Sequence, residues 1–163
     1  MLAVSCSTGD SVYKAYFGAP QSDLQIATIE GMSFYREDLI NRYWDAVRFL
    51  QVDDVVIENS EEHDAIQVEA GFHEMKVYFH WDLGSQRGLA PALVNYAKTR
   101  DTMTRDLRFN ARAGETYVVR AQPYFNDRRQ DVTTISHVDF WVEDGNGNEV
   151  VSRDQGRYIP SPD

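Results

Sequence analysis

Cysteine is nearly absent from this chain of 163 residues, which contains one, Cys6. A single cysteine cannot form a disulfide within the chain, so burial and hydrogen bonding must hold the fold. No apolar run approaches the roughly 20 residues of a membrane-spanning helix. Cations are outnumbered, with 16 Lys and Arg against 26 Asp and Glu and a net charge of −10. Because nucleic-acid affinity depends on cations that neutralise phosphates, this balance argues against a nucleic-acid partner.

What the chain does contain is enough apolar material for a core. Hydrophobic residues make up 42% of it and aromatic residues 12%, which excludes a disordered chain. A chain of this length fits one domain that buries about two-thirds of the surface exposed by its unfolded form. The composition therefore indicates an acidic globular domain.

The clearest pattern lies in residues 64–82. Ile66 and Val68 alternate with polar residues, and after Gly71 the alternation resumes. Four residues then share one face: Met75, Val77, Phe79 and Trp81. Alternation with a period of two across a glycine-bearing turn predicts a β-hairpin with one buried face.

Two later stretches show the same pattern. Residues 107–121 alternate around Gly114, and residues 138–152 alternate around a turn at 144–148. We predict a second and a third hairpin, with Arg108 opposite Arg120 on the outward face of the second. Residues 144–148 also match the opening of a calcium loop, but Glu149 replaces the glycine of that loop, which favours a hairpin turn.

The remaining segments are less regular. Residues 24–30 predict a strand, and residues 47–57 predict two short strands separated at Asp53 and Asp54. Apolar residues recur at helical spacing in residues 33–45, which predicts a short amphipathic helix. Pro91 would suit the first turn of a short helix within residues 83–104. The alternative for this segment is an ordered flap.

These elements predict a mainly β protein: an antiparallel β-sandwich of seven to eight strands with one or two short helices. The domain would cover residues 24–153. Residues 1–23 would form a leader or tether, and residues 154–163 a loose tail.

Catalytic and metal-binding patterns do not emerge from the sequence. His73 and His80 are seven residues apart on one predicted strand, which places them on opposite faces and over roughly 20 Å apart at about 3.3 Å per residue. With no cysteine nearby, a zinc site would lack its usual ligands. There is no G-x-S-x-G nucleophile motif and no glycine-rich phosphate loop. We therefore expect no catalytic residues, no metal and no cofactor.

Charge is unevenly distributed. Residues 51–75 contain eight carboxylates and no Lys or Arg, whereas residues 98–129 contain eight cations and four carboxylates. The arginines that carry a partner-binding hypothesis are Arg108, Arg112 and Arg120. Their partner would be an envelope protein or an anionic envelope polymer; the alternative is that carboxylates of a neighbouring strand neutralise them. The aromatic residues that could bind a ligand are Trp44, Trp81 and Trp141.

Two resemblances suggest a location. The start, MLAVSCSTG, resembles the end of a bacterial lipoprotein signal, in which Cys6 would be lipidated. By this resemblance, Ser7 in place of aspartate implies sorting to the outer membrane. Five residues before Cys6 are too few for a whole signal peptide, so this interpretation expects coding sequence upstream of Met1.

The run VRFLQVDDVVIEN and the later AIQVEAGFHEMKVYFHW resemble small envelope sandwich domains, including the PEGA type, with an immunoglobulin-like plan. Gly71 and His73 match the turn glycine and histidine, while Ala70 replaces the proline and Asp54 the turn glycine. The resemblance covers roughly residues 24–152. It implies a location in the cell envelope and a non-catalytic role, and it assigns no functional residues.

The sequence thus favours a lipid-anchored periplasmic module with a structural or binding role and no enzymatic activity. The alternative is a soluble sandwich domain that binds a small ligand or a carbohydrate.

Overall fold

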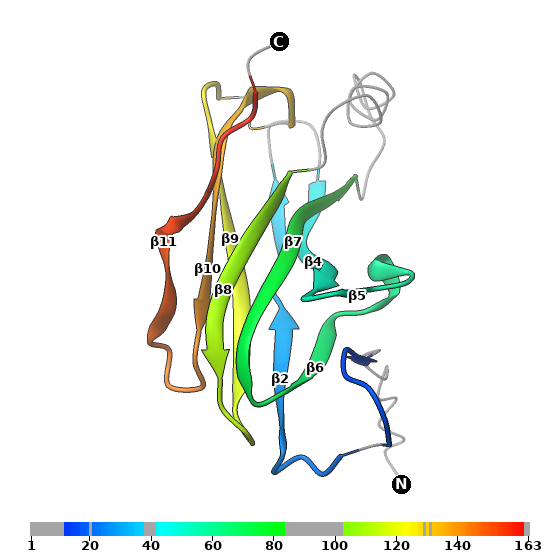
Figure 1. Cartoon of the computed structure of the whole chain (residues 1–163). Coiled ribbons are helices and arrows are strands. Elements are labelled where there is room, and N and C mark those ends of the chain that lie inside the picture. The colour runs from blue at the N-terminus through cyan, green and yellow to red at the C-terminus, as the bar shows by residue number, and fades with distance from the viewer. Residues whose placement is uncertain are drawn as a thin grey trace, which may run out of the picture.

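The computed structural model describes residues 12–19, 21–37, 42–83, 103–128, 130 and 132–161. Their strands form two sheets (Figure 1). The six-stranded sheet has the order β1 (Val12–Lys14), β6 (Ala65–Glu69), β2 (Ile26–Gly31), β9 (Thr116–Phe125), β10 (Ile135–Glu143) and β11 (Glu149–Tyr158). The five-stranded sheet has the order β3 (Ser33–Glu37), β4 (Arg42–Val52), β7 (Gly71–Leu83) and β8 (Thr104–Ala111), with β5 (Val55–Val56) paired to β4.

One hydrophobic cluster joins the two sheets. Large, fully buried side chains come from both: Ile29, Ile66, Tyr117 and Phe140 from the six-stranded sheet, and Tyr43, Phe49, Met75 and Leu107 from the five-stranded sheet. Along β7 the predicted inward face is confirmed, since Met75, Val77 and Phe79 are buried. Burial of this alternating apolar face is the main favourable term in folding.

The mainly β prediction is confirmed, but the helix predicted in residues 33–45 is wrong. Within the described residues the only helical elements are two 3₁₀ turns, η1 (Ser60–Glu62) and η2 (Val132–Thr134). β3 and β4 occupy most of the predicted helix and pair with each other. Tyr43 and Val47 do share a buried face, but they do so on a strand. Aromatic and β-branched residues fit a half-buried sheet surface, and strand pairing overrode the helical spacing.

No helix in the described part of the chain is both long enough and apolar enough to cross a membrane. The segment predicted as a helix or flap, residues 83–104, lies mostly outside the described residues.

Two of the three predicted hairpins are also wrong. β6 pairs with β1 and β2, whereas β7 pairs with β4 and β8, so the chain changes sheet at Ala70. It changes sheet again in residues 112–115, between β8 and β9. Alternation around a turn glycine predicts that the chain reverses direction and that each of the two strands has a buried face. It does not decide whether the two strands pair in one sheet or lie in opposite sheets. Here they face each other across the core.

The third hairpin is confirmed. β10 and β11 are antiparallel, and the Asp144 N–H donates to the Asn148 carbonyl at 2.9 Å. The Asp144 carboxylate accepts the N–H groups of Asn146 and Asn148, both at 2.9 Å. These hydrogen bonds lower the pKa of Asp144, with the Asn148 N–H contributing most. The polar residues of this loop therefore form a hairpin turn, as expected.

The topology differs from an all-antiparallel plan of seven to eight strands. The described residues form eleven strands, and the β1–β6 and β2–β9 pairs are parallel. β1 lies in the segment expected to be a tether. At the other end, residues 154–158 were expected to be loose, but they form the second half of β11.

A direct passage from β2 into β3 connects the sheets. The Met32 N–H donates to the Val119 carbonyl of the six-stranded sheet at 2.9 Å, and the Met32 carbonyl accepts the Val47 N–H of the five-stranded sheet at 2.8 Å. A Cβ atom on Gly31 would lie only 2.2 Å from the Val47 carbonyl oxygen. The close approach of the two sheets therefore requires glycine at this position.

β11 contains a break in register opposite β10. Phe140 pairs with Gly156 and Val142 with Val151. An advance of two residues along β10 therefore corresponds to five residues along β11. Beyond the break, β11 returns so closely to β10 that a Cβ atom on Gly156 would lie 1.9 Å from the Phe140 carbonyl oxygen.

Gly156→Ala should therefore destabilise the protein by about 1–3 kcal/mol or more, because the added methyl group meets backbone that cannot rotate away. Gly145→Ala is the matched control: its Cβ atom would meet its nearest neighbour, the Thr116 carbonyl oxygen, at an ordinary 3.7 Å. We expect the control to change stability by less than about 0.5 kcal/mol. Urea unfolding followed by circular dichroism measures both, and equal stabilities would contradict the packing described for Gly156.

Candidate functional site

The three tryptophans lie in different environments and form no common site. Trp141 is buried, with 5% of its surface exposed. Its indole N–H donates to the Glu143 carboxylate at 2.8 Å, and the Arg153 guanidinium covers its ring at 3.8 Å from the centroid. Trp81 packs against the core, and only Trp44 is exposed, on β4. The fold therefore does not bring the three tryptophans together in one site.

Trp44 does have an aromatic neighbour. The ring of Tyr35 on β3 lies 5.2 Å away and edge-on, at 77°. Tyr35 and Trp44 are 55% and 43% exposed. This pair is a small aromatic patch on the outer face of the five-stranded sheet.

The three arginines of the partner hypothesis are likewise separated. Arg108 on β8 binds Glu74 on β7 at 2.6 Å, and Arg120 on β9 binds Glu143 on β10. Arg112 lies 3.8 Å from Glu115 at the crossing from β8 to β9.

The predicted opposition of Arg108 and Arg120 is wrong, because the two residues belong to different sheets. Each instead has a carboxylate partner, as the alternative interpretation expected. Cys6, the proposed lipidation residue, lies outside the described residues.

His73 connects three segments of backbone. Its Nδ1 lies 2.7 Å from a carboxylate oxygen of Asp53, and its Nε2 lies 2.7 Å from the Glu69 carbonyl oxygen. Partial burial would raise the pKa of Asp53, but hydrogen bonds from the Glu74 N–H and from His73 more than offset this and lower it. Both ring nitrogens of His73 are engaged, so this residue ties the turn after β4 to the crossing between β6 and β7. In the described part of the chain, no three His, Cys, Asp or Glu side chains form a group that could hold a metal ion.

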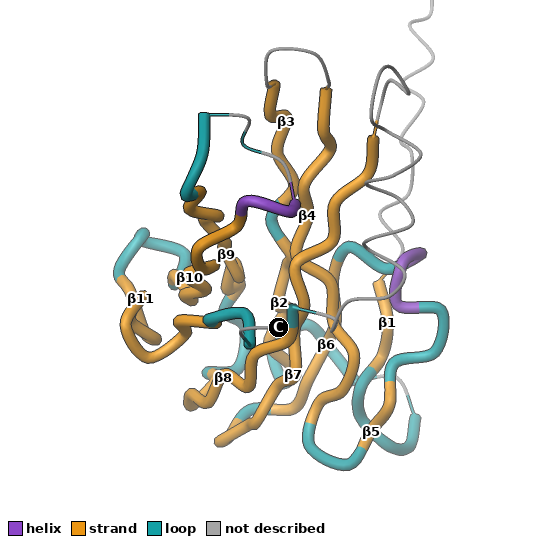
Figure 2. Tube along the Cα trace, turned by 90° about the horizontal axis from the view of Figure 1, so that it is seen from above, coloured by secondary structure: helices purple, strands orange, loops and turns teal. Residues whose placement is uncertain are grey.

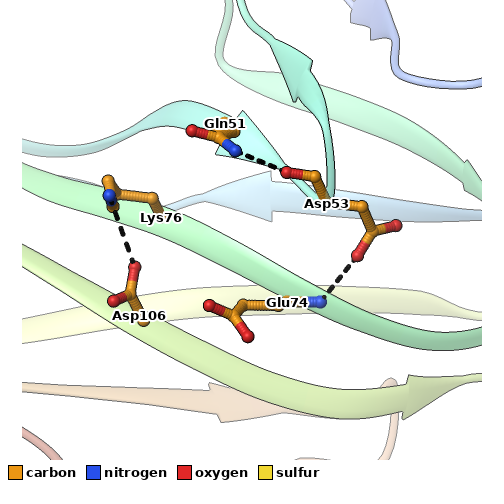
Figure 3. A pocket seen from close by; sticks show the side chains of 5 residues that line it. All are labelled: Gln51, Asp53, Glu74, Lys76 and Asp106. Carbon is orange, nitrogen blue, oxygen red and sulfur yellow. Dashed lines mark hydrogen bonds and ion pairs between the residues drawn. The ribbon is translucent and has the colours of Figure 1, made fainter.

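A small polar pocket lies beside this connection (Figure 3). It has a volume of about 50 Å³ and is lined by Gln51, Asp53, Glu74, Lys76 and Asp106. Asp53 and Glu74 are engaged as described, and Asp106 lies 4.0 Å from Lys76. Its charged groups have partners, and its volume suits a few water molecules.

Asp139 is a buried carboxylate on β10 that holds Arg157 of β11 in a two-point contact of 2.6 and 3.0 Å. The hydrogen bond from Arg157 is the main cause that lowers the pKa of Asp139. This pair fastens the end of β11 to β10 and therefore serves the fold.

A second buried pair lies between the sheets. Asp45 is fully buried and accepts a hydrogen bond of 2.6 Å from Arg36, whose side chain is 12% exposed. The Arg36 guanidinium lies between the rings of Tyr43 and Phe125, 4.2 and 4.8 Å from their centroids, and donates to the Gln130 carbonyl. Burial raises the pKa of Asp45 although Arg36 acts to lower it. Removing this carboxylate from water thus disfavours its charged form more than the attraction of Arg36 favours it, as in many buried ion pairs.

A groove lies where the open edges of the two sheets meet. β8 ends the five-stranded sheet and β11 ends the six-stranded sheet, and both lie on the same side of the molecule (Figure 2). The groove between them has a volume of about 360 Å³, within the usual range of ligand sites. Its lining consists of Arg105, Asp106, Leu107, Arg108, Val151 and Gln155.

Arg105 bridges this β8–β11 groove. It donates from Nε and Nη2 to the Gln155 carbonyl oxygen, at 3.3 and 2.9 Å. Asp106 and Arg108 point outward on β8, and the buried Leu107 and Val151 provide an apolar floor. The arrangement offers guanidinium groups, one carboxylate and an amide around an apolar base, which are groups suited to binding.

Comparisons with protein-family models, with curated proteins and with solved structures find no match for this chain.

Sequence reasoning identified Arg108 but missed Arg105 and Gln155. A signal for Arg105 was present, because Arg105 shares the alternation phase of Leu107, Phe109 and Ala111, all buried. Arginine at a core-facing position departs from the apolar alternation of that face of the strand. Gln155 had no such signal, since its position depends on the register break in β11.

The Arg36–Asp45 pair yields a stability test. Arg36→Met should cost about 3–5 kcal/mol, because it leaves the Asp45 carboxylate buried without its cation. Adding Asp45→Leu should recover most of the loss, since apolar replacements of buried ion pairs are often neutral. Arg42→Met removes an exposed ion pair with Glu37 on the same two strands and should cost less than about 1 kcal/mol. Urea unfolding measures all three; a double variant no more stable than Arg36→Met would contradict this account.

Proposed function

We propose that this protein is a non-catalytic binding module of the bacterial cell envelope, built as a β-sandwich, and that the β8–β11 groove is its binding site. The observation that carries the proposal is the groove itself, which combines Arg105 and Arg108 with an apolar floor between two strand edges. Arginine stays protonated in proteins, so these side chains bind charge and do not exchange protons.

The polar groups outside the groove support a role in binding. His73 has both ring nitrogens engaged, Asp139 is held by Arg157, and Asp45 is enclosed with Arg36. Each of these groups fastens one strand to another. A general acid or base needs access to the proton it transfers, and these contacts engage His73, Asp139 and Asp45 in the fold.

The envelope location rests on the segment around Cys6 and on the PEGA-like turn residues. β1 begins at Val12, six residues after Cys6. A lipid on Cys6 would hold the start of β1 within about 22 Å of the lipid-bearing residue, at about 3.6 Å for each extended residue. The sandwich would then stand close to the membrane surface, where envelope proteins and polymers are its neighbours.

Carbohydrate binding through the tryptophans is a second candidate function. The structure offers fewer observations in its favour than it does for the groove. Trp141 is covered by Arg153 and Trp81 packs against the core. The exposed pair Tyr35 and Trp44 offers two rings at a steep angle instead of a flat platform. The groove is therefore the stronger basis for the proposal.

Photo-crosslinking in cells that naturally produce the protein tests the groove. A photoreactive residue at position 106, which lines the groove, should give a defined adduct with a partner. The matched position is 110, where Asn110 is exposed on the same strand and outside the groove. Identical adduct patterns from both positions, or no adduct from position 106, would contradict a binding site in the groove.

Metabolic labelling with a palmitate analogue tests the location. The full-length gene product should incorporate the label, and Cys6→Ala should abolish it, because the thiol of Cys6 would be the attachment point. A Gram-negative host provides the modifying enzymes, and Ser5→Ala, which keeps the cysteine, serves as the control. Unlabelled wild-type protein would rule out the lipid anchor without affecting the argument for the groove.

A further inference from the structure

The strand edges that form the β8–β11 groove have no partner strand. Among the described strands, β8 pairs only with β7 and β11 only with β10. The two edges lie side by side, yet no backbone hydrogen bond between them occurs within the described residues. Open edges of this kind are templates for pairing with another chain.

The edge of β11 is irregular at the break in its register with β10. Residues 152–155 have no partner residue on β10, and the Gln155 side chain accepts hydrogen bonds from the Ser152 N–H and hydroxyl at 3.0 and 3.2 Å. This local structure turns the Gln155 carbonyl toward Arg105. β8 has no register break along its pairing with β7. β8 therefore presents the regular edge, and β11 forms an irregular wall.

Arg105 gives this edge a charge preference. It is partly buried, and its guanidinium binds the neutral Gln155 carbonyl. Among the described residues no carboxylate lies within ion-pair distance of it, whereas the neighbouring Arg108 has Glu74. A carboxylate forms a stronger, charge-assisted hydrogen bond with a guanidinium than a carbonyl does. An incoming carboxylate would thus replace Gln155 as the partner of Arg105.

We infer that the β8–β11 groove binds an extended acidic peptide segment, which adds to the edge of β8 and places a carboxylate on Arg105. This inference rests on the proposed function and names the class of partner. Strand addition uses backbone hydrogen bonds for affinity and side-chain contacts for selection. The open edge of β8 favours a peptide over an anionic polymer, because a polymer without peptide groups could use Arg105 but not the backbone of β8.

Fluorescence anisotropy with the full chain tests the inference. The probe is a labelled peptide of sequence EVEVEVE, and its counterparts are QVQVQVQ, which lacks charge, and EVEPEVE, which keeps its charge but resists strand pairing. We expect the first peptide to bind at least about tenfold more tightly than either counterpart. Dextran sulfate, a polyanion without peptide groups, should compete poorly.

Two variants locate the contact. Arg105→Gln should weaken binding of EVEVEVE about tenfold or more, because a charged hydrogen bond is lost. Arg112→Gln removes an exposed arginine outside the groove and should leave binding unchanged. Circular dichroism confirms folding. If Arg105→Gln does not fold, salt provides the second measurement: raising it should weaken binding of EVEVEVE by the wild-type chain.

Each contrary result overturns one part of the inference about the acidic peptide. Equal binding of EVEVEVE and QVQVQVQ removes the role of charge, and equal binding of EVEPEVE removes strand addition in favour of a polyanion surface. No binding at millimolar peptide overturns the inference as a whole. If position 106 still crosslinks a partner in cells, the inference fails alone; if it does not, the proposed function fails with it.

Discussion

The passage of the chain through Gly31 and Met32 is the constraint on which the two sheets depend. At Met32 one residue gives its N–H to the six-stranded sheet and its carbonyl to the five-stranded sheet. Both layers are therefore fixed to each other by backbone hydrogen bonds, at a distance that leaves no room for a side chain on Gly31. Within the described residues, no backbone hydrogen bond joins the edge strands β8 and β11. The groove between β8 and β11 lies where each sheet ends in an edge strand.

Charge pairing follows from this geometry. The acidic middle of the sequence and the basic stretch after it fold into neighbouring strands, so their charges meet. Glu74 of the acidic middle meets Arg108 of the basic stretch in this way, and Asp64 with Arg48 and Glu143 with Arg120 are further ion pairs of the described residues. Exposed pairs of this kind add little stability each, but they leave few cations without a carboxylate. Arg105 differs from these arginines because its partner is a neutral carbonyl.

Sequence patterns predicted the strands far better than their partners. Alternation located β6 to β10 and the first half of β11, since a period of two reports which side chains are buried. It could not report that the reversals at Ala70 and at residues 112–115 move the chain between sheets, because the burial pattern is the same for a hairpin and for a crossing. The helical spacing around Tyr43 and Val47 misled for a related reason: a short apolar run fits either period until its neighbours are known. Arg108 was identified from charge and alternation, whereas Gln155 depends on a backbone irregularity that leaves no trace in composition.

The parallel pairing of β2 with β9 has a consequence for how the protein is made. Thr28 pairs with Thr116 and Gly31 with Val119, so the inner part of the six-stranded sheet joins residues almost ninety positions apart. Contacts between such distant positions form slowly, because a long loop must close before they contribute. During synthesis β2 must wait until β9 has left the ribosome. A chain that cannot complete its core early stays unfolded for longer, and its apolar strands stay exposed to other chains until β9 has been made.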